Sequence, residues 1–119
     1  MVDESWRMIP NYEGRYQVSD HGRVRSLLTY HRSRKEIIMR DLPHYKGYRM
    51  IFLRDSKQVK TKHFIHRLVA HSFLYNHDSL PVVNHKDGNK KNNAIHNLEW
   101  VTFSENTKHY YSMATDEAF

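Results

Sequence analysis

The segment VNHKDGNKKNN, from Val83 to Asn93, constrains the fold of this chain more than any other. It holds four asparagines, three lysines, one histidine, one aspartate and one glycine, and it lies between the apolar runs LPVV and LEWVT. A dense polar segment between two short apolar runs favours two strands joined by a loop. We therefore predict strands at residues 80–85 and 98–102, with Asp87-Gly88 forming a turn in the loop between them.

A helix is predicted to follow the second strand without a linker. Thr102 is followed three residues later by Glu105, the pattern of a reciprocal N-terminal cap, and the helix is expected at residues 103–113. The first turns of such a helix must lie near the end of the first strand. One imidazole and two amide oxygens would then converge in a groove, from His85, Asn84 and Asn106.

The preceding two-thirds of the chain are expected to be mainly β. Turn signals break residues 1–30 into short strands, and another strand is expected at residues 35–42. Residues 48–53 and 59–64 favour a hairpin with a polar tip. The apolar period then changes, and the spacing of Ile65, Leu68, Val69 and Phe73 predicts a helix at residues 64–74.

Charge and composition narrow the class of protein. The 119 residues suit one domain, the absence of cysteine excludes disulfides and thiolate zinc sites, and the net charge of +6 favours a polyanionic partner. No apolar run is long enough to span a membrane, and the first residues lack the layout of a secretory signal, so a cytoplasmic protein is expected. The first forty residues carry much of the basic charge, at Arg15, Arg23, Arg25, Arg32, Arg34, Lys35 and Arg40.

Three segments resemble known sequence families. NHKDGNKKNNAIHNLEWVTFSEN, from Asn84 to Asn106, strongly resembles the ββα-metal core, or His-Me finger, of HNH endonucleases of the phage and intron homing type. HRLVAHSF, from His66 to Phe73, resembles the segment that usually precedes that core. WRMIPNYEGRYQVSDHGRVRSL, from Trp6 to Leu27, is similar to the NUMOD4-type module that often accompanies it.

The resemblance implies an α+β fold in two parts. A mainly β N-terminal lobe at residues 1–62 would contact DNA. A bridging helix and a C-terminal ββα-metal core would occupy residues 63–119. Related homing enzymes often carry a further C-terminal helix-turn-helix module, which does not follow Asn106 in this sequence, so we expect lower site selectivity or a partner that supplies it.

The resemblance also implies roles for individual residues. His85 matches the general base, and Asn97 matches the asparagine that ties the loop to the strands and helps to orient the base. Asn84 and Asn106 match metal ligands, although other family members often have aspartate or histidine at the first position and histidine at the second. We expect a backbone carbonyl or the Asn97 region to hold the other ring nitrogen of His85. Contacts to DNA are expected from Lys86, Lys90, Lys91, Arg23 and Arg25.

Several residues in these segments also have plainer explanations. Asp87-Gly88 is more typical of a turn than of a metal ligand, and the three loop lysines suit either a solvated face or phosphate contact. His66 and His71 are five residues apart, which favours packing over a helical metal pair. His109, one turn after Asn106, is a reserve candidate for a metal ligand. The two tryptophans, Trp6 and Trp100, are expected in the core.

The predicted activity is hydrolysis of DNA with His85 as base and one Mg²⁺ ion, with Mn²⁺ able to substitute. The expected partner is double-stranded DNA, and the protein is expected to be a monomer or a weak dimer that nicks one strand. Two alternatives remain open at this point. One is a non-catalytic DNA-binding module, and the other is a non-specific or RNA-directed nuclease with the same core.

Overall fold

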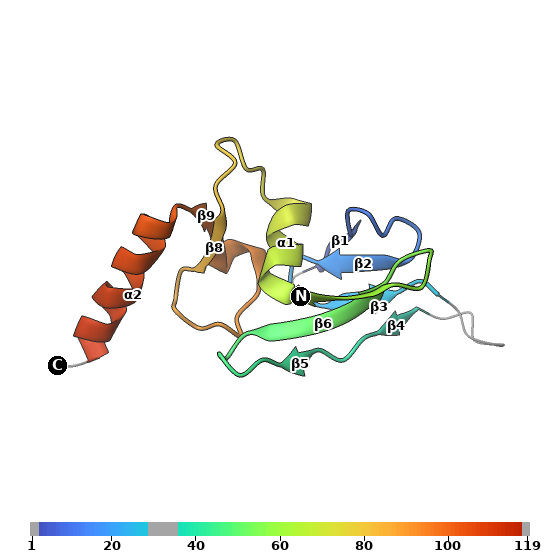
Figure 1. Ribbon diagram of the computed structural model, residues 1–119, viewed down its shortest axis with the longest axis horizontal. Coiled ribbons are helices and arrows are strands. Elements are labelled where there is room, and N and C mark those ends of the chain that lie inside the picture. Colours follow the sequence, from blue (N-terminus) through green and yellow to red (C-terminus); the bar gives the residue numbers. More distant parts are fainter. Residues whose placement is uncertain (1–2, 29–35, 118–119) are drawn as a thin grey trace.

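Three small antiparallel sheets surround one central helix, and a second helix projects from one end of the molecule (Figure 1). This computed structural model describes residues 3–28 and 36–117, with the side chains of the last helix described as far as Met113. Arg32, Arg34 and Lys35 lie outside the described residues. The Cα trace extends 56 × 31 × 29 Å, so the described chain is elongated along the direction in which the last helix projects.

The first sheet comes from the segment with closely spaced turn signals. Its antiparallel strands follow the chain order β1 (Trp6–Met8), β2 (Tyr16–Ser19), β3 (Val24–Ser26) and β4 (Ile37–Ile38). Alternate residues of β2 and β3 are buried, among them Tyr16, Val18 and Val24, because successive side chains of a strand point to opposite faces. The buried face of this sheet packs on the central helix.

The second sheet contains the predicted hairpin. Its order is β5 (Leu42–Pro43), β6 (Arg49–Arg54) and β7 (Lys60–Phe64), all antiparallel. The prediction of one strand at residues 35–42 is wrong, because Ile37–Ile38 pairs with β3 whereas Leu42–Pro43 pairs with β6. The chain changes sheets over residues 39–41, where Asp41 accepts a hydrogen bond from Arg49 at 2.9 Å.

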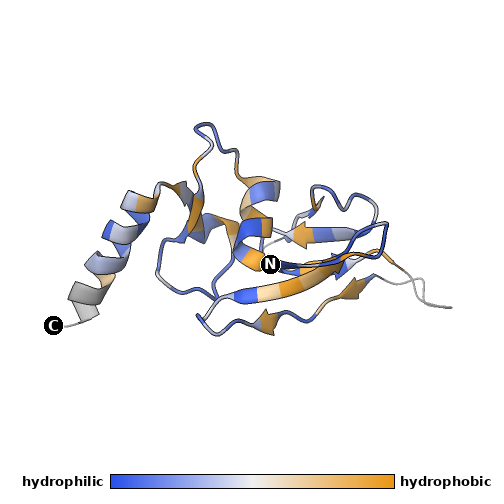
Figure 2. Cartoon of the chain, viewed as in Figure 1, coloured by the Kyte–Doolittle hydropathy of each residue, from blue (hydrophilic) through white to orange (hydrophobic). Residues whose placement is uncertain are grey.

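Helix α1 (Ile65–Phe73) occupies the predicted position and carries the core. Its stripe of Ile65, Leu68 and Val69 is buried. The core continues through side chains of both sequence segments, from Ile9, Val18, Val24 and Leu53 to Val83 and Leu98. Figure 2 shows hydrophobic segments gathered where α1 meets the strands. Because one core spans residues on both sides of position 62, the proposed division of the chain there stays a prediction.

The last third has the predicted order of strand, loop, strand and helix. Strands β8 (Val82–His85) and β9 (Leu98–Val101) pair antiparallel, and the loop between them ends in the single 3₁₀ turn η1 (Ile95–Asn97). Helix α2 (Phe103–Glu117) begins two residues after β9. It extends beyond the predicted end at residue 113, since no glycine or proline follows Met113 to stop it.

The predicted reciprocal cap of α2 is present. Thr102 Oγ1 accepts from the Glu105 backbone N–H at 3.0 Å, and Glu105 Oε1 accepts from the Thr102 N–H at 3.1 Å. These two bonds satisfy backbone donors that the first turn of a helix cannot pair internally. The cap therefore fixes where α2 starts, and so the position of Asn106. Within the described residues, no helix is long and apolar enough to cross a membrane.

We expect Thr102→Ala to lower the free energy of unfolding by about 1 kcal/mol, because it removes the cap acceptor of α2. Thr107→Ala is the matched control, since Thr107 is an exposed residue inside the same helix whose hydroxyl only bonds back to the Phe103 carbonyl at 2.9 Å. Urea denaturation monitored by circular dichroism measures both. Equal stability of the two variants would contradict the role of the cap.

Candidate active site

A groove of about 420 Å³ lies between the end of β8, the loop after it and the inner side of α2. The structure brings Asn84, His85 and Asn106 together in its lining, as the sequence order suggested. Tyr48, just before β6, lines the groove from the side of the second sheet. Further lining residues are Lys90, His109 and Tyr110. The groove is therefore built from three segments that are distant in the sequence.

His85 is the buried imidazole of this groove, with 5% of its surface exposed. Its Nε2 lies 2.8 Å from Oδ1 of Asn93, and because an amide oxygen only accepts, Nε2 carries the proton. The lone pair is thereby left on Nδ1. Burial lowers the pKa of His85 and outweighs the hydrogen bond to Asn93 and the charge of Asp87, which raise it, while the charge of Lys90 lowers it slightly further. The ring is therefore neutral at neutral pH, as a proton acceptor must be.

Two aromatic rings lie beside the imidazole of His85. His66 lies against it with ring centroids 4.9 Å apart, and Tyr48 stacks on His66 at 5.0 Å with an interplanar angle of 22°. His66 is 6% exposed, and burial lowers its pKa to about 3, so it packs as a neutral ring. The packing role expected for His66 agrees with this placement. His71, by contrast, is exposed and meets the edge of Trp100.

Asn97 ties the loop rather than the imidazole. Its Oδ1 accepts from the Asp87 N–H at 3.1 Å, and its Nδ2 donates to Asp87 Oδ1 and to the Asn92 carbonyl, each at 2.9 Å. The expected partner of the His85 ring was a carbonyl or the Asn97 region, but the structure has Asn93 in that place. Four asparagines precede Ala94 in this segment, and nothing in the sequence singled out Asn93.

Asp87 and Gly88 form the predicted turn. The Gly88 N–H donates to the His85 carbonyl at 2.9 Å, and Gly88 has a φ of +76°. A Cβ at this position would meet only the thioether of Met113 on α2, a flexible side chain that can move aside. The positive φ of the backbone is therefore what favours a glycine here.

Asn84 is oriented by a residue that the sequence did not reveal. It lies opposite Glu99 in the β8–β9 register, and its Nδ2 donates to Glu99 Oε1 at 2.9 Å. This bond leaves Oδ1 as the Asn84 atom that can ligate a cation. The cross-strand pairing of the two predicted strands was the signal that could have found Glu99.

The residues present fit a loosely held Mg²⁺ ion. Asn106 lines the same groove from α2 as Asn84 does from β8, and both side chains carry the oxygen ligands that Mg²⁺ prefers. No group of three histidine, aspartate or glutamate side chains that could hold a metal occurs among the described residues. An ion bound at the two asparagines would complete its shell with water and a phosphate oxygen.

His109, the reserve ligand candidate, fastens α2 to the loop. Its Nε2 donates to the Lys86 carbonyl at 3.0 Å. Because the proton is on Nε2, only Nδ1 of His109 retains a lone pair. The ring therefore serves first as a structural link between the helix with Asn106 and the strand end with His85.

Of the three loop lysines, Lys90 lies at the groove. Its Nζ donates to the Lys46 carbonyl at 2.8 Å and lies 4.6 Å from the centre of the Tyr48 ring. Lys86 and Lys91 are exposed and do not line the groove. Phosphate contact by these three residues stays a prediction, with Lys90 the best placed.

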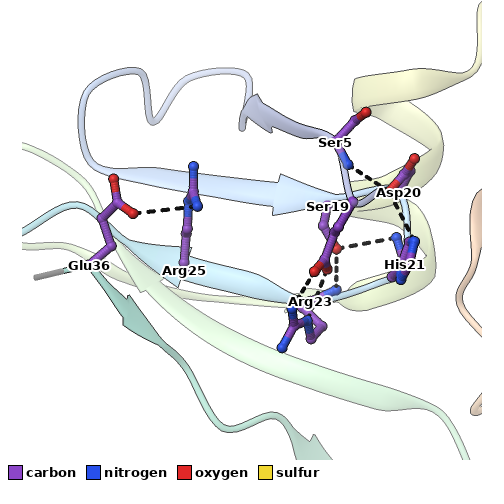
Figure 3. Close-up of polar contacts among 8 residues, drawn as sticks. Ser5, Ser19, Asp20, His21, Arg23, Arg25 and Glu36 are labelled. Atoms are coloured by element: carbon purple, nitrogen blue, oxygen red, sulfur yellow. Dashed lines mark hydrogen bonds and ion pairs between the residues drawn. The ribbon is translucent and has the colours of Figure 1, made fainter. Parts of the chain in front are cut away.

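The two arginines predicted to contact DNA are engaged within the protein. Arg23 pairs with Glu4, and Arg25 lies 3.4 Å from Glu36 (Figure 3). Arg25 also donates to Gln17 Oε1 at 2.7 Å. The Arg23 guanidinium lowers the pKa of the Glu4 carboxyl to about 2. Their contact with DNA stays a prediction, and it would require phosphate to compete with these carboxylates.

Trp6 is half-buried beneath the same arginines. The Arg25 guanidinium carbon lies 4.2 Å from its ring centre and that of Arg23 5.7 Å. Trp6 is thus not part of the hydrophobic core expected for it, whereas Trp100 packs against that core. The face of a tryptophan ring attracts a guanidinium because the π electrons give both faces of the neutral ring a partial negative charge.

The arrangement is that of a ββα nuclease core: a strand that ends in a histidine, a loop tied by an asparagine, a second strand, and a helix with an asparagine in the same groove. Residues 63–108 match the family described as HNH endonuclease, and residues 4–54 match the NUMOD4 motif. The chain belongs to the HNH endonuclease family and carries a NUMOD4 motif upstream of the core. The resemblance inferred from its motifs is thereby confirmed.

Two relatives come from phage and prophage. The chain is 41% identical over 110 residues to the DNA endonuclease I-HmuI of Bacillus phage SP01, covering 92% of this chain and 59% of that protein. It is 48% identical over 67 residues to the SPbeta prophage-derived putative HNH homing endonuclease YosQ of Bacillus subtilis, covering 56% of this chain and 38% of that one.

A solved structure of the HNH homing endonuclease I-HmuI, described for its DNA binding and cleavage, has the same fold. It superposes with a TM-score of 0.77 at 38% identity, over 93% of this chain and 60% of that one. The chain thus spans about three fifths of the length of this relative. The likeness includes both the NUMOD4 segment and the nuclease core.

The buried His66 should make the stability of the fold depend on pH. Its pKa is about 3 in the folded protein and about 6.5 in an unfolded chain, so only the unfolded state gains a proton between these values. Its contribution to stability is complete above about pH 6.5 and is lost as the pH falls toward 3. We expect His66→Phe to reduce the pH slope of the unfolding free energy there by about 1.4 kcal/mol per pH unit.

Urea denaturation at several pH values between about 4 and 7 measures this slope. The control is His96→Phe, which changes an exposed histidine of η1 and should keep the slope of the parent protein. A parent slope that His66→Phe leaves unchanged would show that His66 takes up a proton in the folded state.

Proposed function

We propose that this protein is a metal-dependent DNA endonuclease that nicks one strand, with His85 as general base and one Mg²⁺ ion at Asn84 and Asn106. The observation that carries the proposal is the neutral, buried His85 facing a groove that also contains two amide oxygens. Membership of the HNH endonuclease family supports the same reaction. Double-stranded DNA is the proposed substrate, since the chain carries a net charge of +6 and a NUMOD4 motif.

His85 would act through Nδ1. With Nε2–H donated to Asn93, Nδ1 accepts a proton from a water molecule in the groove. The water oxygen forms a bond to phosphorus as the bond from phosphorus to the 3′ oxygen breaks. The 3′ oxygen leaves as an alkoxide and takes a proton from solvent, so the products are a 5′ phosphate and a 3′ hydroxyl. A Mg²⁺ ion, when bound, supplies positive charge to the phosphoryl oxygen and to the departing alkoxide.

Two further residues support these groups. Glu99 accepts from Nδ2 of Asn84 and so leaves Oδ1 available for the ion, and Lys90 in the groove lining supplies a positive charge for a neighbouring phosphate. One ββα core has one such site and acts on one strand. A double-strand break would therefore need two copies of the core or two successive nicks, and the protein is proposed to act as a monomer or weak dimer.

His85→Ala should abolish most nicking of supercoiled plasmid, by about 100-fold or more, because it removes the imidazole proposed to take the proton from water. DNA affinity should change little, since the imidazole carries no charge. His96→Ala is the matched control and should nick at the parent rate. Agarose gels in Mg²⁺, in Mn²⁺ and with a chelator measure the activity, and undiminished nicking by His85→Ala would refute the assignment.

The same gels separate the alternatives. A parent protein that shifts DNA in a binding assay but never nicks it would be a DNA-binding module without activity. Equal cleavage of RNA and DNA would identify a nuclease of broad substrate range. The expected result is chelator-sensitive nicking of DNA, with Mn²⁺ able to replace Mg²⁺.

The Asn84–Glu99 pair gives a second prediction about the metal. Asn84→Asp adds a carboxylate ligand, but it lies beside the Glu99 carboxylate, and two like charges in contact oppose each other. Adding Glu99→Gln removes that repulsion and supplies an amide donor to the new carboxylate. We expect the double variant to need about tenfold less Mg²⁺ for half-maximal nicking than Asn84→Asp alone.

Glu99→Gln alone is the control for this comparison. A glutamine oxygen can still accept from Nδ2 of Asn84, so its metal requirement should stay within about twofold of the parent value. Identical metal requirements of the double variant and Asn84→Asp would mean that Glu99 does not act on the ligand position.

A further inference from the structure

A turn of the N-terminal sheet packs directly against the loop that holds the candidate base. Gly22, in the turn between β2 and β3, has a φ of +89°, and a Cβ at this position would lie 2.8 Å from Cβ and 3.0 Å from the carbonyl oxygen of Asn93. Beside this contact, the Ile95 N–H donates to the Asp20 carbonyl at 2.8 Å. No side chain larger than hydrogen fits between the turn and Asn93 without displacing one of them.

The turn that makes this contact is itself tightly held. The buried Ser19 Oγ accepts from the N–H groups of His21 and Arg23 at 3.2 and 3.1 Å. Oδ1 of Asp20 accepts from the Ser5 N–H at 3.0 Å (Figure 3). These bonds fix the backbone on both sides of Gly22. The turn is therefore a rigid surface against which the loop between β8 and β9 packs.

On the other side of the contact, Asn93 holds His85. Asn93 is 5% exposed, and its Oδ1 is the acceptor 2.8 Å from Nε2 of the imidazole. The bond selects the ring tautomer with the proton on Nε2 and the lone pair on Nδ1. A displaced Asn93 would release the ring, so that the two tautomers could interchange.

We propose that Gly22 and Asn93 are positioning residues for His85. Gly22 of the NUMOD4 segment packs against Asn93 and holds it in place, and Asn93 sets the tautomer of the imidazole. The N-terminal segment then helps to position His85, in addition to any contact that it makes with DNA. The effect on catalysis rests on the proposed nuclease function, whereas the effect on the tautomer does not.

Gly22→Ala tests the contact, and Gly14→Ala is its matched control. Gly14 has a φ of +81°, but a Cβ there would meet nothing within 4 Å, so the two variants share the backbone penalty and differ in the contact. The ¹⁵N shifts of the His85 ring report its tautomer in metal-free protein at about pH 8, above the ordinary pKa of histidine. We expect one Nε2–H form in the parent and in Gly14→Ala, and a mixture in Gly22→Ala.

Nicking rates give the second readout. Gly22→Ala should lower kcat by about 10- to 100-fold while KM for plasmid stays within about twofold, because the base is misplaced and the DNA-facing side chains are not. Gly14→Ala should keep the parent kcat. A tautomer and a kcat in Gly22→Ala that both equal those of Gly14→Ala would overturn the proposal.

Two variants of Asn93 test the proposal even if Gly22→Ala does not fold. Asn93→Ala keeps the Cβ that rests on Gly22 and removes the acceptor, whereas Asn93→Asp keeps an oxygen acceptor of similar size. Mixed tautomers in the first and the Nε2–H form in the second are expected, and an unchanged tautomer in Asn93→Ala would overturn the proposal. If the parent itself does not nick, the nuclease function fails, and the ¹⁵N shifts still decide this inference.

Discussion

The hydrogen bond between His85 and Asn93 is the interaction on which the groove depends, because it is buried and sets which ring nitrogen of the proposed base keeps its lone pair. Other hydrogen bonds of the region hold the segments that carry His85 and Asn93. Asn97 closes the loop from which Asn93 projects, and His109 links α2 to the residue after His85. A neutral imidazole with a set tautomer follows from this framework, whereas an exposed histidine at the same position would titrate and rotate freely.

Charge is distributed unequally between the two parts of the molecule. Arg23 pairs with Glu4, and Arg25 lies beside Glu36 and over the ring of Trp6, so much of the charge of these two arginines is balanced within the protein. Lys90 at the groove has no carboxylate partner and bonds only to a backbone carbonyl among the described residues. A phosphate approaching the groove therefore meets less competition there than at the paired Arg23 and Arg25.

Local patterns were sufficient to predict the nuclease core. The apolar stripe of α1, the strands on either side of the polar loop and the Thr102–Glu105 cap all depend on residues within about one helical turn or one strand of each other. The roles of Glu99, Asn93 and Gly22 were not predicted, because each acts through a partner that only the folded chain brings near. The prediction of one strand at residues 35–42 was wrong for the same reason, since the sheet that each part of this segment joins depends on which sheet edge the folded chain leaves unpaired.

The fit of Gly22 against Asn93 bears on how such enzymes exchange their parts in evolution. A DNA-binding segment joined only by a linker can be replaced by another through recombination, and the nuclease gains a new target. Here the β2–β3 turn packs directly on Asn93, so a newly acquired segment must reproduce a glycine at the position of Gly22 and a carbonyl at that of Asp20. The junction therefore restricts which replacements yield an active enzyme, and the first sheet and the core are expected to be inherited together.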